Sequence, residues 1–314
     1  MSRGNNSKGF TLVITAALLW GMSGAVAQKL FQQYHIEVNW LVTSRLLIAG
    51  FLLLIVQFKF RDRAQIFNVW RQPRSAIQLL IFALFGTLAV QYTYMAAIDQ
   101  GNAAVGTLLQ YLAPALIILY LILRKQSALN IRDTVSVSLA LIGCFLLLTD
   151  GAISKLSVPP MAIVWGLLSA VALAFYTLYP VRLLKKFDSI VIVGWAMVIG
   201  GLVLNVVHPI WKMDVSRLTL SAWGYLFFVV VLGTMIAFWF YIESLQSLAP
   251  KETSLLSSLE PLAAVLSTVF WLGEPFGPFQ WLGSACMMIM LIFVAVNQGT
   301  SVTDKKTDAT RQVS

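Results

Sequence analysis

The chain has 314 residues, of which 59% are hydrophobic and only 11% are charged, and its mean hydropathy is +0.80. A soluble domain has about 45–50% apolar and about 25% charged residues, so this composition argues against a water-soluble enzyme and against a disordered chain. Two cysteines and two histidines are too few for a disulfide scaffold, a four-ligand zinc site or a histidine-rich catalytic site.

Long apolar windows run through the whole chain. A bilayer core of about 30 Å needs about 20 apolar residues in a helix, and a helix satisfies its own backbone hydrogen bonds in lipid. In chain order, the expected spans are Gly9–Gln28, Val38–Phe58, Ser75–Ile98, Gln100–Leu123, Thr134–Thr149, Leu156–Val181, Ser189–Trp211, Leu218–Ile242, Thr253–Gly273 and Pro275–Thr303. The sequence therefore predicts an all-α integral membrane protein with ten transmembrane helices.

The net charge of +9 is explained by the loops between these windows. If the N-terminus is inside, 17 of the 22 Lys and Arg residues fall in inside segments and 4 fall in outside segments. This asymmetry predicts a multi-pass protein of the cell membrane with both termini cytoplasmic. It explains the positive charge without a nucleic-acid partner, and we expect none. The basic segment 59–74 can lie on the anionic inner leaflet or serve only as a topology determinant.

The first window has a second interpretation as a cleaved signal peptide, with Ala25-Val26-Ala27 as the cleavage site. Its removal would leave nine spans and would break an internal repeat. Residues 85–119 and 232–266 align without gaps at a shift of 147, with 8 identities in 35 positions. The informative matches are Gly86-Thr87 with Gly233-Thr234, Tyr94 with Tyr241, and Pro114 with Pro261.

The repeat divides the chain into two halves of five spans, residues 9–149 and 156–297, with polar tails at 1–8 and 298–314. Because five is odd, the second half must cross the membrane in the opposite sense. Inverted repeats around a midplane site are the architecture of many secondary transporters. A duplication retained only for folding is the alternative explanation.

Three motifs resemble the EamA-type proteins of the drug/metabolite transporter superfamily. Trp20-Gly21-Met22-Ser23 is similar to the family's Trp-Gly-Ser signature, Arg45 to its second-span arginine, and Leu259-Glu260-Pro261 with Gly273-Glu274 to the end of its ninth span. The first half departs from this pattern, because Ala113-Pro114 lacks the glutamate. The resemblance covers about residues 9–297 and implies a ten-helix metabolite transporter, often an exporter, without specifying the substrate.

Glu260 and Arg45 are the two charges expected inside the membrane. A carboxylate at that depth costs several kcal/mol unless it is paired, protonated or hydrated, which suits proton coupling or cation binding as well as a structural role. Thr253, Ser257, Glu260 and Ser267 give the ninth span a polar stripe. Arg45 has three possible roles: pairing with Glu260, binding an anionic group of the substrate, or extending to the outer headgroups.

Two prolines and several aromatic residues complete the candidate path. Pro114 and Pro261 are expected to kink their helices and to free the carbonyl groups of Gln110 and Ser257, unless the kinks only shape packing. Polar and aromatic faces are expected on three spans, and their rings either line the path or belong to the membrane interface. The residues singled out on these faces, together with the signature tryptophan, are Trp20, Gln91, Tyr94, Trp165, Tyr176 and Tyr241.

We therefore expect a secondary transporter that moves a small polar metabolite through a central cavity by alternating access, with export of an amino acid or related compound as the first hypothesis. Import of an amine or quaternary ammonium compound is the alternative within this class, and a non-transporting membrane sensor or assembly protein is the alternative outside it. The expected partners are a small-molecule substrate, a proton or another ion, and membrane lipid. The sequence contains no P-loop, nucleophile elbow or metal-ligand spacing, so we expect no enzyme activity, cofactor or metal.

Overall fold

The computed structural model describes residues 3–125, 131–152, 156–244, 247–248, 253 and 256–311, and within these residues the regular structure is helical, without strands. The first half contains α1 (Arg3–Tyr34), α2 (Val38–Phe60), α3 (Ala64–Arg71), α4 (Pro73–Ile81), η1 (Phe82–Leu88), α5 (Ala89–Gln100), α6 (Ala103–Gln110), α7 (Ala113–Leu123) and α8 (Ile131–Thr149). The second half contains α9 (Pro160–Leu178), α10 (Val181–Leu184), α11 (Ser189–Val207), η2 (Ile210–Lys212), η3 (Val215–Arg217), α12 (Leu220–Phe227), η4 (Phe228–Ile236), α13 (Ala237–Ser244), α15 (Leu259–Leu266), η5 (Ser267–Trp271) and α16 (Pro278–Arg311).

Many of these helices are long and apolar enough to cross a membrane. Among the described residues, seven helices meet this criterion by length and composition, and three shorter apolar helices cover Asp133–Thr149, Leu259–Trp271 and Pro278–Val294. Large apolar side chains such as Phe51, Leu141 and Val206 are exposed on their outer faces. A surface of this kind is expected where a protein contacts lipid tails rather than water.

The internal repeat is visible in matching irregularities of the two halves. In the third span of each half, a π-helical segment interrupts the α-helix: η1 lies between α4 and α5, and η4 lies between α12 and α13. The two segments coincide when the chain is shifted by the 147 residues of the repeat, and they contain Gly86-Thr87 and Gly233-Thr234. π-helical turns inside α-helices occur mostly at functional sites.

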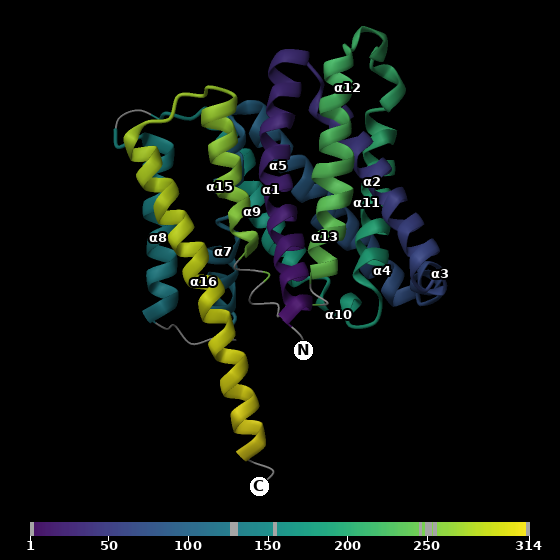
Figure 1. The fold of residues 1–314 in the computed structure, drawn as a ribbon, viewed down its shortest axis with the longest axis vertical. Coiled ribbons are helices and arrows are strands. Elements are labelled where there is room, and N and C mark those ends of the chain that lie inside the picture. Colours follow the sequence, from purple (N-terminus) through teal and green to yellow (C-terminus); the bar gives the residue numbers. More distant parts are fainter. Residues whose placement is uncertain are drawn as a thin grey trace.

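The packing of helices follows the same symmetry. Helix α2 packs against its counterpart α11, and α8 packs against its counterpart α16 (Figure 1). Helix α1 packs against α13, η4 and α15 of the second half, whereas α9 packs against α5, η1, α6 and α7 of the first half. The first helix of each half therefore lies against the third and fourth spans of the other half, so neither half has a separate core.

Close packing at the centre depends on small residues. A Cβ atom at Gly21 would overlap the carbonyl oxygen of Glu260 and the side chain of Ala263, and one at Gly233 would overlap the side chain of Ser23. Glycine at these two positions lets α1 approach α15 and η4, as small residues do in membrane helix packing.

Two terminal segments differ from the sequence expectation. Helix α1 begins at Arg3, and α16 continues as helix to Arg311, where we expect polar tails up to residue 8 and from residue 298. Both described ends of the chain lie at the same end of the bundle, together with α3 and α10 (Figure 1). We call this end of the bundle the terminal end and the opposite end the far end.

Candidate functional site

Glu260 lies where a helix of the second half meets a break in a helix of the first half. It occupies the first turn of α15, where the exposed N–H groups of a helix favour a negative charge. Tyr111 lies in the break between α6 and α7, and its hydroxyl donates a hydrogen bond of 2.7 Å to Oε2 of Glu260. The carboxylate is therefore held across the junction of the two halves.

Arg45 is buried on α2, with only 5% of its surface exposed. Its Nε donates a hydrogen bond of 2.6 Å to Oγ1 of Thr234 in η4, and its Nη1 lies 3.6 Å from Sδ of Met95. The Thr234 hydroxyl in turn donates to the carbonyl oxygen of Val229, at 2.8 Å. Arg45 thus connects the first half to the π-helical segment of the second half.

The position of Arg45 bears on each of its three expected roles. Burial of the guanidinium group excludes extension to the outer headgroups. The described ion pairs do not include one between Arg45 and Glu260, although the two charges are close enough to interact electrostatically. Binding of an anionic group remains as a proposal.

Tyrosine side chains surround the two charges. The charge of Glu260 acts electrostatically on Tyr94, Tyr111 and Tyr241, so these residues share one region of the bundle with Glu260 and Arg45. We call these five residues the central cluster. The hydroxyl of Tyr94 is hydrogen-bonded to Oγ1 of Thr107 at 2.8 Å.

The other predicted residues lie around this cluster. The Trp20 ring packs on Tyr241 and Phe238, with centroid distances of 5.3 and 5.1 Å. Tyr176 lies near Tyr241 and packs on Phe82, with ring centroids 4.9 Å apart.

The Trp165 ring packs on Tyr92, with centroids 5.8 Å apart. On the same helix, Ser169 accepts a hydrogen bond of 2.7 Å from Nε2 of Gln110. Gln91 is buried. The Trp165 and Ser169 contacts join α9 to α5 and α6, and no described hydrogen bond or ring contact joins these residues or Gln91 to Glu260.

The two prolines lie near the starts of helices, whereas we expected them to kink continuous helices. Pro114 lies in the first turn of α7 and Pro261 in the first turn of α15. The chain forms a turn before each, at Tyr111 and at Ser258, so the helices are interrupted. The first turn of a helix tolerates proline, because its N–H groups have no partner within the helix. Ser257 precedes the second break and has an interaction partner.

Sequence reasoning did not single out Tyr111, although it lies three residues before Pro114 and next to Gln110. It also missed Gln28, which is fully buried on α1. Nε2 of Gln28 donates to Oε1 of Glu274 at 2.6 Å, and its Oε1 accepts the N–H of Ala103 at 2.8 Å. This side chain ties α1 to the start of α6 and to the segment after η5. The sequence feature that could have pointed to Gln28 was its partner Glu274, which belongs to the Gly273-Glu274 motif.

Among the described residues there is no group of three or more His, Cys, Asp or Glu side chains that could hold a metal ion. The chemistry available in the central cluster is one carboxylate, one guanidinium group and several phenol groups. Such groups bind and orient a polar solute through charge and hydrogen bonding.

Comparisons with known proteins agree with this architecture. A model of the EamA-like transporter family matches residues 7–149 and 160–296. The "Uncharacterized inner membrane transporter YicL" of Salmonella typhimurium is 35% identical over 296 residues, which are 94% of this chain and 97% of that protein. The "Uncharacterized transporter YwfM" of Bacillus subtilis is 26% identical over 289 residues, 90% of this chain and 92% of the relative.

A more distant relative is the chloroplastic WAT1-related protein At3g02690 of Arabidopsis thaliana, which is 24% identical and matches 92% of this chain and 70% of that protein. One solved structure superposes with a TM-score of 0.62 at 18% identity, and the match covers 94% of this chain and 99% of the other, which shows a shared fold. The family match spans both halves and confirms the resemblance carried by Trp20-Gly21, Arg45 and Glu260-Pro261: the chain belongs to the EamA-like transporter family.

Proposed function

We propose that this protein is a secondary transporter with ten transmembrane helices in two inverted halves and both termini in the cytoplasm. It moves a small polar metabolite across the cell membrane by alternating access, and export of an amino acid or a related compound is the first hypothesis. Supporting this proposal are the family membership, the repeat, and the polar cluster at the junction of the halves.

The observation that carries the proposal is the pairing of Glu260 with Tyr111 between the two halves. The phenol is an exchangeable partner, since a substrate ammonium group or a proton can take its place on the carboxylate. Arg45 offers hydrogen-bond donors to an anionic group near the same region. A zwitterionic amino acid presents both complementary charges.

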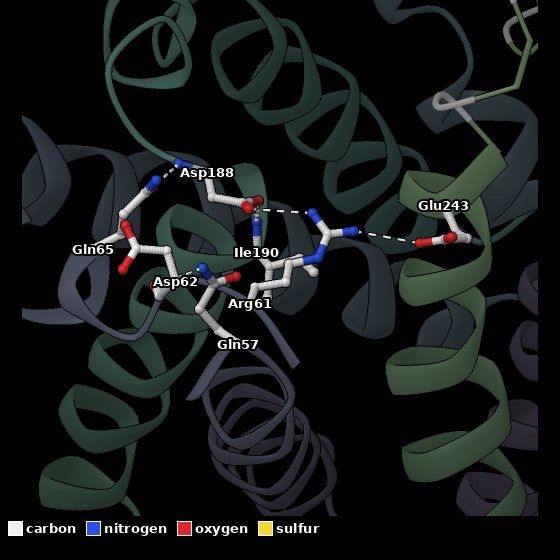
Figure 2. Close-up of polar contacts among 7 residues, drawn as sticks. All are labelled: Gln57, Arg61, Asp62, Gln65, Asp188, Ile190 and Glu243. Carbon is white, nitrogen blue, oxygen red and sulfur yellow. Dashed lines mark hydrogen bonds and ion pairs between the residues drawn. The ribbon is translucent and has the colours of Figure 1, made fainter. Parts of the chain in front are cut away.

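Each end of the bundle has polar contacts that must alternately break in such a cycle. At the far end, Gln28 joins α1 to Glu274 and to α6. At the terminal end, Arg61 forms ion pairs with Asp188 at 3.1 Å and with Glu243 at 3.3 Å (Figure 2). The Gln28–Glu274 contact and both Arg61 ion pairs join segments of different halves, so relative movement of the halves would break them.

The test is counterflow in proteoliposomes with a panel of amino acids, amines and organic acids. We expect saturable exchange of at least one amino acid, and we expect Glu260→Gln to abolish it while the variant still inserts and remains monodisperse. Glu37→Gln is the control, because Glu37 is exposed in the turn between α1 and α2. Absence of saturable flux for every solute class would contradict the proposal.

Import of an amine is the second candidate. It is favoured by the Trp20 and Tyr241 rings, which pack together near Glu260 and can bind a cation over their faces. Radiolabelled amines in right-side-out and inside-out vesicles separate the candidates. Uptake of an amine only in right-side-out vesicles would replace the first hypothesis by the second.

A further inference from the structure

A groove of about 560 Å³ lies on the outside of the bundle, away from the central cluster. Its floor is α1, and its walls are α12 with η4 on one side and η5 on the other. Figure 1 shows α1 between α15 and α12 along this face of the molecule. The volume falls within the range of about 300–1,000 Å³ that is typical of sites for small ligands.

The groove and the central cluster use different faces of α1. Met22, Val26 and Lys29 follow one another at spacings of four and three residues, which places them on one stripe of the helix. Met22 and Val26 line the groove. Gly24, on another stripe, lies instead against Tyr94 of the central cluster.

Lys29 lies beside the groove, against two of the aromatic rings that line it. Its ammonium group lies 5.2 Å from the ring centroid of Tyr225 and 4.9 Å from that of Trp271, and both rings line the groove. The ion pairs found in the described part of the chain do not involve Lys29. The two rings hold a positive charge in place without neutralising it.

The lining determines which ligand fits. Apolar groups dominate it, and Met22 and Trp271 remain 43% and 46% exposed, so the groove opens to the surface that we assign to lipid. Lys29 lies in the last two turns of α1 before Tyr34, near the expected boundary of the membrane at the far end. A ligand with an alkyl chain and an anionic headgroup would place the chain along α1 and the charge at Lys29.

We propose that this groove binds an anionic phospholipid, with one acyl chain between α1, α12 and η5 and the headgroup phosphate at Lys29. Of the possible amphiphiles, a phospholipid is the one present at this face at high local concentration. The site is independent of the central cluster and of the direction of transport.

Native mass spectrometry of the purified chain in a non-ionic detergent tests this proposal, with dioleoyl phosphatidylglycerol and dioleoyl phosphatidylcholine as probes. We expect the wild type to retain one phosphatidylglycerol in preference to phosphatidylcholine. Lys29→Gln should reduce this preference about fivefold, as expected for loss of one lysine near a membrane surface, and Lys29→Arg should retain it.

Gly224→Leu tests the acyl-chain part of the site, because a Cβ at Gly224, which lines the groove, meets no atom within 4 Å. The added side chain should fill the groove without disturbing α12 and should reduce retention of both lipids. Lys212→Gln and Ala285→Leu are matched controls at exposed positions elsewhere, and neither should change retention.

An unchanged lipid preference in Lys29→Gln would overturn the headgroup assignment, and unchanged retention in Gly224→Leu would overturn the chain assignment. Thermal unfolding of each variant verifies its folding. If Gly224→Leu unfolds, Gly224→Val, which adds a smaller side chain to the same open space, takes its place. Unchanged retention of both lipids in a Gly224→Val variant that unfolds at the wild-type temperature would equally reject the chain assignment.

Discussion

Thr87 and Thr234 occupy equivalent positions in the two halves but have different surroundings. Both are buried in π-helical segments. The Thr234 hydroxyl accepts from Arg45 and donates to Val229, whereas the buried Thr87 hydroxyl has no partner in the part of the chain that the structure describes. The duplication has therefore kept the residue and changed what it does.

This difference predicts unequal effects of the same substitution. Thr234→Val leaves the buried Nε of Arg45 without its acceptor and should destabilise the protein by about 1–3 kcal/mol. Thr87→Val replaces an unpaired hydroxyl by a methyl group and should be neutral or stabilising. Thermal unfolding in detergent measures both, and equal losses for the two variants would contradict the assigned hydrogen bonds.

A second prediction concerns the partner of Glu260. Tyr111→Phe removes the hydrogen bond to the carboxylate without changing the size of the side chain, and hydrogen bonds to charged groups contribute about 1.5–3 kcal/mol. We expect transport to fall at least about tenfold, measured as kcat/KM in proteoliposomes. Tyr120→Phe on α7 is the control, because the Tyr120 side chain is 43% exposed. Equal activities of the two variants would remove Tyr111 from the site.

The candidate site was only partly predictable from individual residues. Glu260 and Arg45 could be singled out because a charge inside an apolar window is conspicuous. Their partners Tyr111 and Thr234 are 149 and 189 residues away in the chain, and nothing in the local sequence indicates these pairings.

At the scale of elements, Asp188 connects three segments at the terminal end of the bundle (Figure 2). Its Oδ1 caps α11 by accepting the N–H of Ile190 at 3.1 Å, and its Oδ2 pairs with Arg61. Its own N–H donates to Oε1 of Gln65 in α3 at 2.7 Å. The segment between α2 and α4, read from sequence as a basic loop, is thus a short helix tied to α11.

The two roles of Asp188 can be separated by substitution. Asparagine caps a helix about as well as aspartate, so Asp188→Asn should lose only the partly exposed ion pair, about 0.2–1 kcal/mol. Asp188→Ala should lose the cap as well, a further cost of about 0.5–2 kcal/mol. The comparison requires unfolding in denaturant or heat for both variants. Equal stabilities would show that the cap contributes nothing.

Apolar composition predicts where the spans lie, but it does not predict where their α-helices are interrupted. Pro114 and Pro261 indicated where the fourth and ninth spans deviate from a regular helix. The π-helical segments η1 and η4 had no such signal, because apolar residues suit an α-helix and a π-helix equally well. In η4, Gly233 and Thr234 contact Ser23 and Arg45 of other helices, and these contacts cannot be read from the local sequence.

At the scale of the whole molecule, the proposed inverted arrangement predicts which side of the membrane each loop faces. Single cysteines at Lys125 and Lys185, in a background with Cys144 and Cys286 replaced by alanine, should react with a membrane-impermeant reagent only from the cytoplasmic side. A cysteine at Lys212, between α11 and α12, should react only from outside. Labelling of Lys125 and Lys185 positions from opposite sides would contradict the inverted repeat.

The sequence by itself determined that the chain is helical, embedded in a membrane, internally duplicated and a member of its family. These properties depend on local composition, on apolar window length and on matches between segments, all of which are written along the chain. Only the tertiary structure decided that Arg45 bonds Thr234 rather than Glu260, that Tyr111 holds the carboxylate of Glu260, and that Lys29 lies against two rings of a groove. Such contacts depend on how helices distant in sequence approach one another, and this is set by packing at small residues such as Gly21 and Gly233.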